Sequence, residues 1–292
     1  MRPAGLGGHH YARSGPCNNG DSAPCLQTSV RRARVIAIAS QSIAAAIGLL
    51  TGACVGSFIG TALVRLPAGR SLVRARSACD ACDSRVSIAD LVPIGSWLVL
   101  RGRCRTCGEA IGGWQLAAEV AGAGAGFAPW VLTTDPWLAL LMMAMGWQLL
   151  LLALLDARHS WRPLRLVGLL GATGLAGAIG FALREHPTVH IEVALIGGGL
   201  GWGALALVRL LYMRVRGAEG MGAADPWLMG AVGLWLGPLG VVEALLGASM
   251  VGIVAAATML VLGQRIAGDT ALPLGTCIAV AAWPLFCLQG FG

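Results

Sequence analysis

The sequence contains no lysine: all 21 basic side chains are arginine, and only 12% of the 292 residues are charged. A soluble domain usually has about 25% charged residues. The apolar fraction is 56% and the mean hydropathy is +0.72. This composition argues against a soluble protein and indicates a lipid bilayer as the surrounding solvent. It also argues against a nucleic-acid-binding protein, because the arginines stand at the ends of apolar runs and define no basic groove.

Long apolar segments fill most of the chain after residues 1–34, a Gly/Ser/Asn/Pro-rich tail that we expect to be disordered. Each segment is near the roughly 20 residues that a helix needs to cross about 30 Å of hydrocarbon. The expected fold class is therefore an all-α polytopic membrane protein with about eight transmembrane helices. The expected spans are 35–63, 113–133, 137–155, 163–183, 190–212, 226–242, 244–263 and 271–289.

The connections between these spans differ in their arginine content. The segment 64–112 has eight arginines, the next connection has none and the third has three, and the alternation continues along the chain. Cytoplasmic connections carry the excess of positive charge. We therefore expect 64–112 and the other odd-numbered connections in the cytoplasm, with both termini outside. The five arginines of residues 1–34 conflict with this orientation.

Four of the nine cysteines form two CxxC pairs in the polar segment 64–112: Cys79 with Cys82, and Cys104 with Cys107. Two such turns bring four thiolates onto one tetrahedral ion. Thiols stay reduced in the cytoplasm, so we expect structural Zn²⁺, with thiol redox chemistry as the alternative. A closed site leaves no open coordination position. The metal is therefore expected to fold a segment too short to bury a core.

Acidic residues are rare in the apolar part of the chain, and two of them stand at span edges. Asp156 ends the third span and Asp225 begins the sixth, both on the expected cytoplasmic side. Two carboxylates held together in a partly desolvated site tend to share one proton, so that one acts as acid and the other as base toward water. This pair predicts an aspartyl protease. The alternatives are that Asp225, which precedes Pro226, caps its helix, and that Asp156 marks the membrane boundary.

Six ordered segments resemble motifs of the type IV prepilin peptidases, also called leader peptidase/N-methyltransferases, a family of GxGD-type membrane aspartyl proteases. The resemblance runs from about residue 50 to 285. The first segment in the chain is "GSFIGTALVRLP", and the second is the double CxxC segment, which includes "PIGSWLVLRGRC". The remaining four, in order, are "WQLAAEVAGA", "LLALLDARH", "EGMGAAD" and "LPLGTCIAVAAW".

The resemblance implies an endopeptidase that cleaves the basic leader of prepilins or pseudopilins at the cytoplasmic face of the bacterial inner membrane. It also implies methylation of the new amino terminus with S-adenosylmethionine. Asp156 and Asp225 fall on the catalytic aspartates of the family and the four cysteines on its zinc ligands. Gly102 falls on a glycine linked to methylation. The implied organisation is a first helix at 35–63, a zinc segment at 64–112 and a membrane-embedded peptidase core at 113–292.

The chain departs from the family pattern close to the proposed catalytic pair. Ala224 replaces a glycine of GxGD, and the chain reads Asp225-Pro226-Trp227 where the family often has a lysine shortly after the aspartate. The family's LPD has become Arg162-Pro163-Leu164. These departures support a second hypothesis, a proteolytically inactive member that acts as a scaffold in pilus or secretion assembly. A third hypothesis is a transporter that uses the two aspartates as ion ligands.

Overall fold

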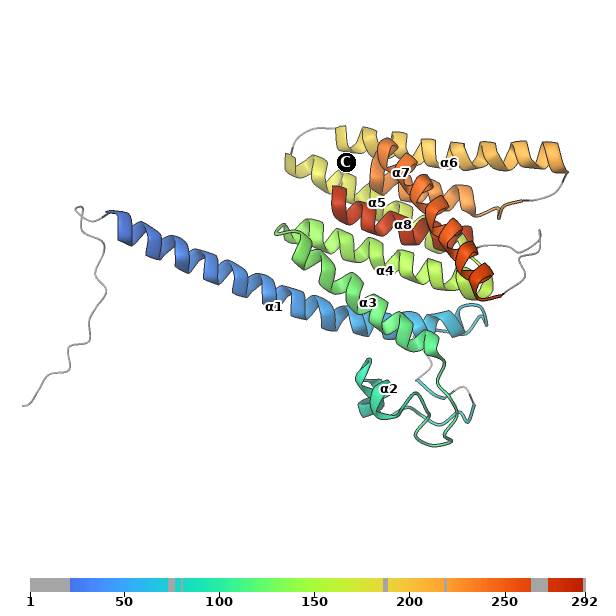
Figure 1. The fold of residues 1–292 in the computed structure, drawn as a ribbon, viewed down its shortest axis with the longest axis horizontal. Helices are drawn as coiled ribbons and strands as arrows, with labels where there is room; N and C mark the ends of the chain where they lie inside the picture. Colours follow the sequence, from blue (N-terminus) through green and yellow to red (C-terminus); the bar gives the residue numbers. More distant parts are fainter. Residues whose placement is uncertain are drawn as a thin grey trace, which may run out of the picture. The chain divides into compact units, whose positions relative to one another are not determined.

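The computed structural model describes residues 22–72, 77–79, 81–185, 189–217, 220–263 and 273–290, and this part of the chain contains helices and two isolated β-bridges but no strand. The expected all-α fold is therefore confirmed for the described residues (Figure 1). The helices are α1 (Ser22–Arg65), η1 (Ile88–Leu91), α2 (Gly95–Val99), α3 (Gly113–Leu132), α4 (Pro136–His159), α5 (Leu164–Glu185), α6 (Val189–Arg216), α7 (Asp225–Val261) and α8 (Leu274–Gln289).

Five of these helices are long and apolar enough to cross a membrane. They are α4, α5, α6, α7 and the part of α1 from Arg34 to Arg65. Helix α1 begins at Ser22, inside the segment 1–34 for which we expected no regular structure. Helix propagation from a stable apolar stretch costs little per residue, which accounts for the extension toward the N-terminus. Residues 1–21 lie outside the described residues. The chain divides into two compact units at residue 43, and the rest of the structural description concerns 44–292.

Helix α7 combines the sixth and seventh expected spans and reverses direction at Gly237. Gly237 has φ 68° and ψ −176°, and Pro238 follows it. Glycine accepts a positive φ, and proline is well suited to the first turn of the second arm, so this dipeptide both ends one helix and starts the next. In the second arm, Gly247 faces Ala281 and Gly252 faces Cys277, so this arm runs antiparallel to α8. The turn lies at Gly237, not at residue 243 where we expected it.

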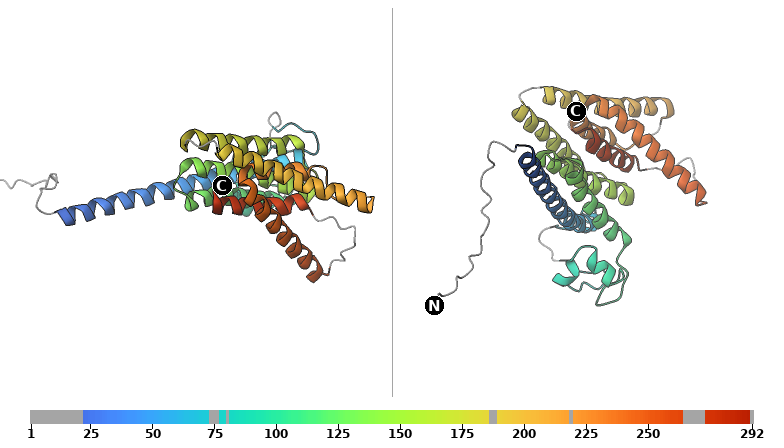
Figure 2. Two further views of the ribbon diagram at one scale, coloured as in Figure 1. Left: turned by 90° about the horizontal axis from the view of Figure 1, so that it is seen from above. Right: turned by 60° about the vertical axis from the view of Figure 1, so that its left-hand side comes forward.

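The helices run back and forth, so that their ends gather at two opposite ends of the bundle (Figure 1). One end holds the segment 64–112, the α4–α5 connection and the starts of α7 and α8; the other holds the α3–α4 connection and the Gly237 turn. Helix α4 packs against α3, α5 and α8, and α7 packs against α5, α6 and α8. The right-hand view of Figure 2 shows the segment between α1 and α3 beside this bundle. The arginine-rich connections therefore share one end, as expected from their alternation.

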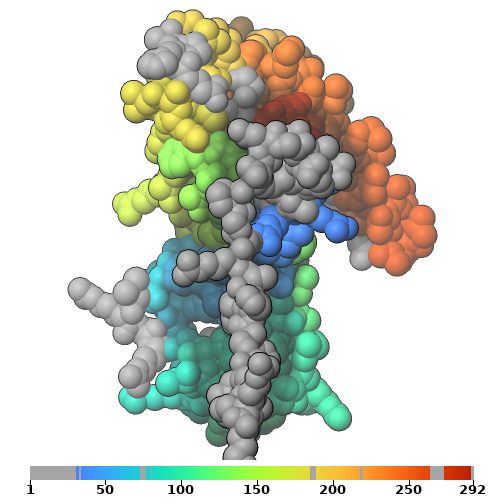
Figure 3. All heavy atoms as spheres, turned by 90° about the vertical axis from the view of Figure 1, so that its left-hand side faces the viewer, coloured from blue at the N-terminus to red at the C-terminus, as the bar shows by residue number. Residues whose placement is uncertain are grey.

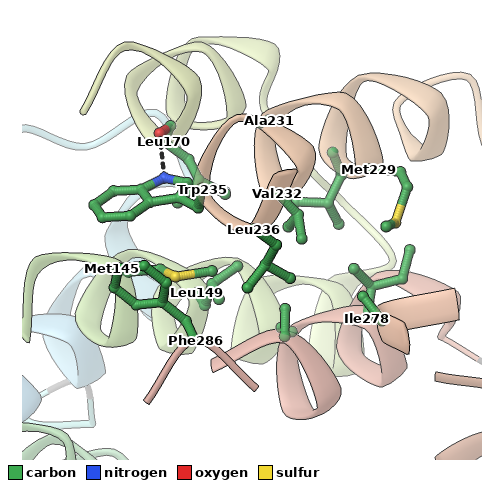
Figure 4. Close-up of a cluster of buried hydrophobic side chains, with 14 of the residues drawn as sticks. Met145, Leu149, Leu170, Met229, Ala231, Val232, Trp235, Leu236, Ile278 and Phe286 are labelled. Atoms are coloured by element: carbon green, nitrogen blue, oxygen red, sulfur yellow. Dashed lines mark hydrogen bonds between the residues drawn. The ribbon is translucent and has the colours of Figure 1, made fainter. Parts of the chain in front are cut away.

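Two tryptophan side chains in the core of the bundle donate hydrogen bonds to backbone carbonyls of neighbouring helices. Trp235 Nε1 donates to the Leu170 carbonyl at 2.8 Å, and the Trp235 ring packs edge-on against Phe286 (Figure 4). Trp283 Nε1 donates to the Met142 carbonyl at 2.9 Å. Indole N–H groups need partners where water is excluded, and these bonds fix the helices against each other while the rings fill the core.

Helices α1 and α3 approach closely through small residues. A Cβ on Gly122 would lie 2.7 Å from the Cα of Gly56, and one on Gly52 would lie 3.0 Å from the Cα of Ala123. Such backbone contact needs residues without side chains and is typical of helix association in lipid. It holds the two helices that flank the cysteine segment at a fixed spacing.

Candidate active site

Asp156 lies in the last turn of α4 and is only 2% exposed. The helix ends at His159 because Ser160 adopts a left-handed conformation with φ 47°. Asp156 Oδ2 accepts hydrogen bonds from the backbone N–H of Thr276 at 2.8 Å and from its hydroxyl at 3.2 Å. Its Oδ1 forms an ion pair with Arg162. Asp156 is therefore held inside the bundle by contacts to α8 and to the connection after α4.

Asp225 opens α7 and is also 2% exposed. Its Oδ2 accepts from the backbone N–H of Gly222 at 2.9 Å, a residue in the preceding turn. The N-cap of α7 is Ala224, which makes no side-chain cap. Asp225 therefore points back to the loop, and the structure gives no support to a helix-capping role for it. Its Oδ1 lies 3.0 Å from Arg162 Nη2 and accepts no hydrogen bond within the described part of the chain.

One arginine joins the two carboxylates, which belong to helices far apart in the sequence. Arg162 contacts Asp156 through Nη1 and Asp225 through Nη2, and only 11% of its side chain is exposed. Sequence patterns alone did not directly indicate that Arg162 belongs to this site. The deviation at position 162 from the resembling family was a signal, but nothing in the sequence showed that its side chain turns into the bundle.

The glycines around the carboxylates leave room for the bridging arginine. A Cβ on Gly275 would lie 2.8 Å from Asp156 Oδ2 and 3.0 Å from Arg162 Nη1, so a larger residue there would push the bridge apart. Ala224 has φ −84°, a conformation that any residue adopts. The replacement of a family glycine by alanine at this position is therefore accommodated without backbone strain.

The four predicted metal ligands converge in the segment between α1 and α3. The thiol sulfurs of Cys79, Cys82, Cys104 and Cys107 all lie within 4.8 Å of one another, and Cys79 Sγ is 3.9 Å from Cys107 Sγ. Four sulfurs at about 2.3 Å from one tetrahedral zinc ion are about 3.8 Å apart, so the cluster fits this metal. Backbone N–H groups of Cys107 and Thr106 lower the pKa of Cys104 to about 6, which favours the thiolate that a metal needs.

The two CxxC turns have the same backbone geometry. The N–H of Cys79 donates to Ser84 O and the N–H of Cys104 donates to Glu109 O, at 2.9 and 2.8 Å. Among the described residues of 64–112, no hydrophobic side chain is buried. The teal residues of this segment form a lobe beside the helices in Figure 3. With no core of its own, this segment depends on the cysteine cluster for its fold.

The buried Glu119 of α3 attaches the cysteine segment to the helices. Its Oε2 accepts from the backbone N–H of Ile94 at 2.6 Å, and its Oε1 accepts from Gln115 Nε2 at 3.1 Å. Gln115 also donates to the carbonyl of Ser57 on α1 at 3.2 Å. An ionised group inside an apolar span is costly to bury, and the contacts of Glu119 position the cysteine segment against α1 and α3.

A cavity of about 350 Å³ lies between this segment and the adjoining parts of α1 and α3, and Trp97, Glu119 and Arg158 are among its lining residues. Trp97 Nε1 is buried and has no hydrogen-bond partner in the described structure. Gly102 packs directly against the Trp97 indole. Its φ is 67°, and a Cβ there would lie 2.7 Å from Trp97 Cζ2, so a larger residue would displace the ring. Cavities of this size commonly hold small molecules.

Comparisons with known proteins identify the family to which the chain belongs. Residues 50–132 match the Bacterial Peptidase A24 N-terminal domain, and residues 143–257 match the Type IV leader peptidase family. The chain belongs to the type IV leader peptidase family. No solved structure matches it.

Curated relatives cover most of the chain. A protein from Stutzerimonas stutzeri named prepilin leader peptidase/N-methyltransferase is 31% identical over 259 residues, 80% of this chain and 87% of the relative. One with the same name from Pseudomonas aeruginosa is 32% identical over the same shares. An Escherichia coli protein named type 4 prepilin-like proteins leader peptide-processing enzyme is 30% identical, over 75% of this chain and 78% of its own length. The two matched domains contain the cysteine cluster and the aspartate pair, respectively.

Proposed function

We propose that the protein is a membrane aspartyl endopeptidase that removes the basic leader from prepilin-like proteins. The observation that carries this proposal is the meeting of two buried carboxylates, Asp156 and Asp225, on one guanidinium group. The names of the relatives, which refer to prepilin leaders, supply the substrate class. The bridge lies at the end of the bundle where the arginine-rich connections gather. From this we infer that the site faces the cytoplasm and that the chain lies in the bacterial inner membrane.

In the proposed mechanism the two carboxylates share one proton and activate a water molecule. Asp156 pairs with Arg162 and accepts hydrogen bonds from Thr276, so it is the ionised partner that takes the proton from water. The water oxygen then attacks the scissile carbonyl carbon. Asp225 Oδ1, which accepts no hydrogen bond from the described residues, carries the shared proton and gives it to the leaving amide nitrogen as the C–N bond breaks. The fixed contacts keep both groups oriented without reorganisation during the reaction.

We further propose that the cavity beside the cysteine segment is where the new amino terminus is methylated. S-adenosylmethionine, when bound, would supply the methyl group. The Trp97 indole offers an aromatic face and an unpartnered donor, and Arg158 offers a positive charge for a carboxylate. His159 Nε2 lies 3.1 Å from the carbonyl of Leu63, another residue of the cavity wall, so the end of α4 that carries Asp156 adjoins this cavity. This proximity suits a product that passes from cleavage to methylation.

The variant Gly102→Ala is expected to reduce methylation by about tenfold or more while leader cleavage continues. Alanine in a left-handed conformation costs about 1 kcal/mol, and its methyl group would also push the Trp97 ring into the cavity. Intact-mass spectrometry of a coexpressed prepilin measures both reactions. Gly69→Ala is the matched control, because Gly69 has φ 64° but open space around it. Equal loss of methylation in both variants would contradict the role of the Trp97 contact.

A second candidate is a proteolytically inactive scaffold, which is favoured by the non-family residues at positions 162, 164 and 227. Coexpression of the wild-type chain with a prepilin separates the two candidates. Leader loss with a new methylated terminus is expected for the enzyme. A correctly inserted protein that leaves the prepilin uncut would support the scaffold. Proton or ion transport is a weaker candidate, because both carboxylates stand at the ends of their helices and not in the middle of the apolar spans.

A further inference from the structure

Arg162 has a position that the peptidase proposal does not by itself explain. It lies in the short connection between α4 and α5, yet its side chain is largely buried and contacts a carboxylate on each of two other elements. Ser160 turns the chain sharply after α4, and Pro163 precedes α5, so the connection has little freedom to place residue 162 elsewhere.

A carboxylate charge inside the bundle needs a cation beside it. Asp156 and Asp225 are both almost fully buried, and even one ionised carboxylate is costly in a low-dielectric site without a partner. Arg209 of α6 also acts on Asp225, and Cys277 of α8 lies near Asp156. The planar fork of Arg162 contacts both carboxylates at once, Asp156 through Nη1 and Asp225 through Nη2.

Arg162 stands where the family that the sequence resembles has the leucine of LPD, and that family often has a lysine shortly after the second aspartate. In this chain Pro226 and Trp227 follow Asp225, and Trp227 is 55% exposed and packs against Trp202 with ring centroids 5.8 Å apart. The α7 helix therefore provides no cation at this point. The positive charge comes from the α4–α5 connection instead.

We propose that Arg162 is a positioning residue that holds Asp156 and Asp225 at the separation at which they share one water molecule. This inference rests on the proposed peptidase function. Arg162 acts through the carboxylates, so its loss affects the chemical step more than the binding of the prepilin.

The test compares Arg162→Leu, Arg162→Gln and Arg162→Lys in purified full-length protein with a prepilin substrate. The two neutral variants are expected to lower kcat by about 100-fold, the usual effect of a misplaced catalytic group, with KM within about threefold. Lysine keeps the charge but only one contact, so an intermediate kcat is expected. Arg165→Leu is the control, because Arg165 is exposed at the start of α5 and contacts neither carboxylate. Its kcat should equal that of the wild type.

A second measurement does not depend on activity. The rate at which a water-soluble carbodiimide and glycine methyl ester label Asp156 and Asp225 is followed by peptide mass spectrometry. Loss of the charge-assisted bridge is expected to raise labelling about tenfold in Arg162→Leu and Arg162→Gln, but not in Arg165→Leu. The glutamine variant preserves the length of the side chain and serves if the leucine variant does not insert.

Two results would overturn the inference: a neutral variant that has wild-type kcat and labelling, or a loss confined to KM, which would make Arg162 a substrate-binding residue. If the wild-type protein cleaves no prepilin, the peptidase proposal fails instead. In that case unchanged labelling would reject the bridge and faster labelling would support it.

Discussion

Replacing either Asp156 or Asp225 by asparagine is expected to lower leader cleavage by about 10³-fold or more. Asparagine keeps the size of the side chain, and its oxygen can still accept from the Thr276 or Gly222 backbone N–H. It cannot take or give the proton that hydrolysis requires, and general acid–base groups typically contribute about 10² to 10⁴ in rate. The double variant should be no slower than either single variant, because the two carboxylates act as a unit. Cleavage is measured by the mass of a coexpressed prepilin.

The control for this experiment lies at the other end of the same helix. Asp135 caps α4, where its Oδ1 accepts from the N–H of Trp137 at 3.0 Å. Asparagine is an equally good cap and only a largely exposed ion pair with Arg184 is lost, so Asp135→Asn should leave cleavage unchanged and stability nearly so. Thermal unfolding in detergent separates lost chemistry from lost structure. A folded Asp156→Asn or Asp225→Asn protein that still removes leaders would refute the proposed catalytic pair.

Removing one cysteine from each CxxC turn is expected to release the metal and unfold the segment between α1 and α3. Binding of zinc to cysteine-rich sites supplies about 10–16 kcal/mol, and the described part of this segment has no buried hydrophobic side chain to compensate. Cys79→Ser combined with Cys104→Ser should therefore contain no zinc by elemental analysis. The exposed arginines of the segment should then become sites of rapid trypsin cleavage, whereas the helices remain protected.

The same double cysteine variant tests whether methylation and leader cleavage take place at different sites. Methylation should be lost, because the cavity wall includes Cys79 and Cys104. The aspartate pair is built from α4, α7 and the α4–α5 connection, so cleavage should fall less. Cys54→Ser is the control, since Cys54 is an exposed residue of α1 outside the cluster. A double variant with full metal content, or with an intact trypsin-resistant segment, would contradict a structural metal at these cysteines.

The local patterns of the sequence determined much of this protein. The scarcity of charge and the length of the apolar runs predicted a helical membrane protein, and two CxxC turns of fixed spacing predicted a four-sulfur cluster. Each apolar run and each CxxC turn involves residues close together in the chain, and backbone geometry limits the conformations that such residues can adopt. The Gly237-Pro238 dipeptide was equally local and was missed, because Glu243 looked like the end of a span. In the structure Glu243 is exposed and bonds to Gln289.

The pairing of Asp156 with Asp225 was predicted from their sides of the membrane, but their geometry depends on the packing of α4 against α8 and of α7 against α8. The bridge by Arg162 was decided only by the tertiary structure. Arg158 and Arg162 are both arginines soon after Asp156, and the sequence does not distinguish them. The turn at Ser160 directs the Arg162 side chain into the bundle, whereas Arg158, which precedes the turn, stays at the surface. The attraction between a cation and a buried carboxylate is strongest when both share low-dielectric surroundings, so the bridge depends on this packing.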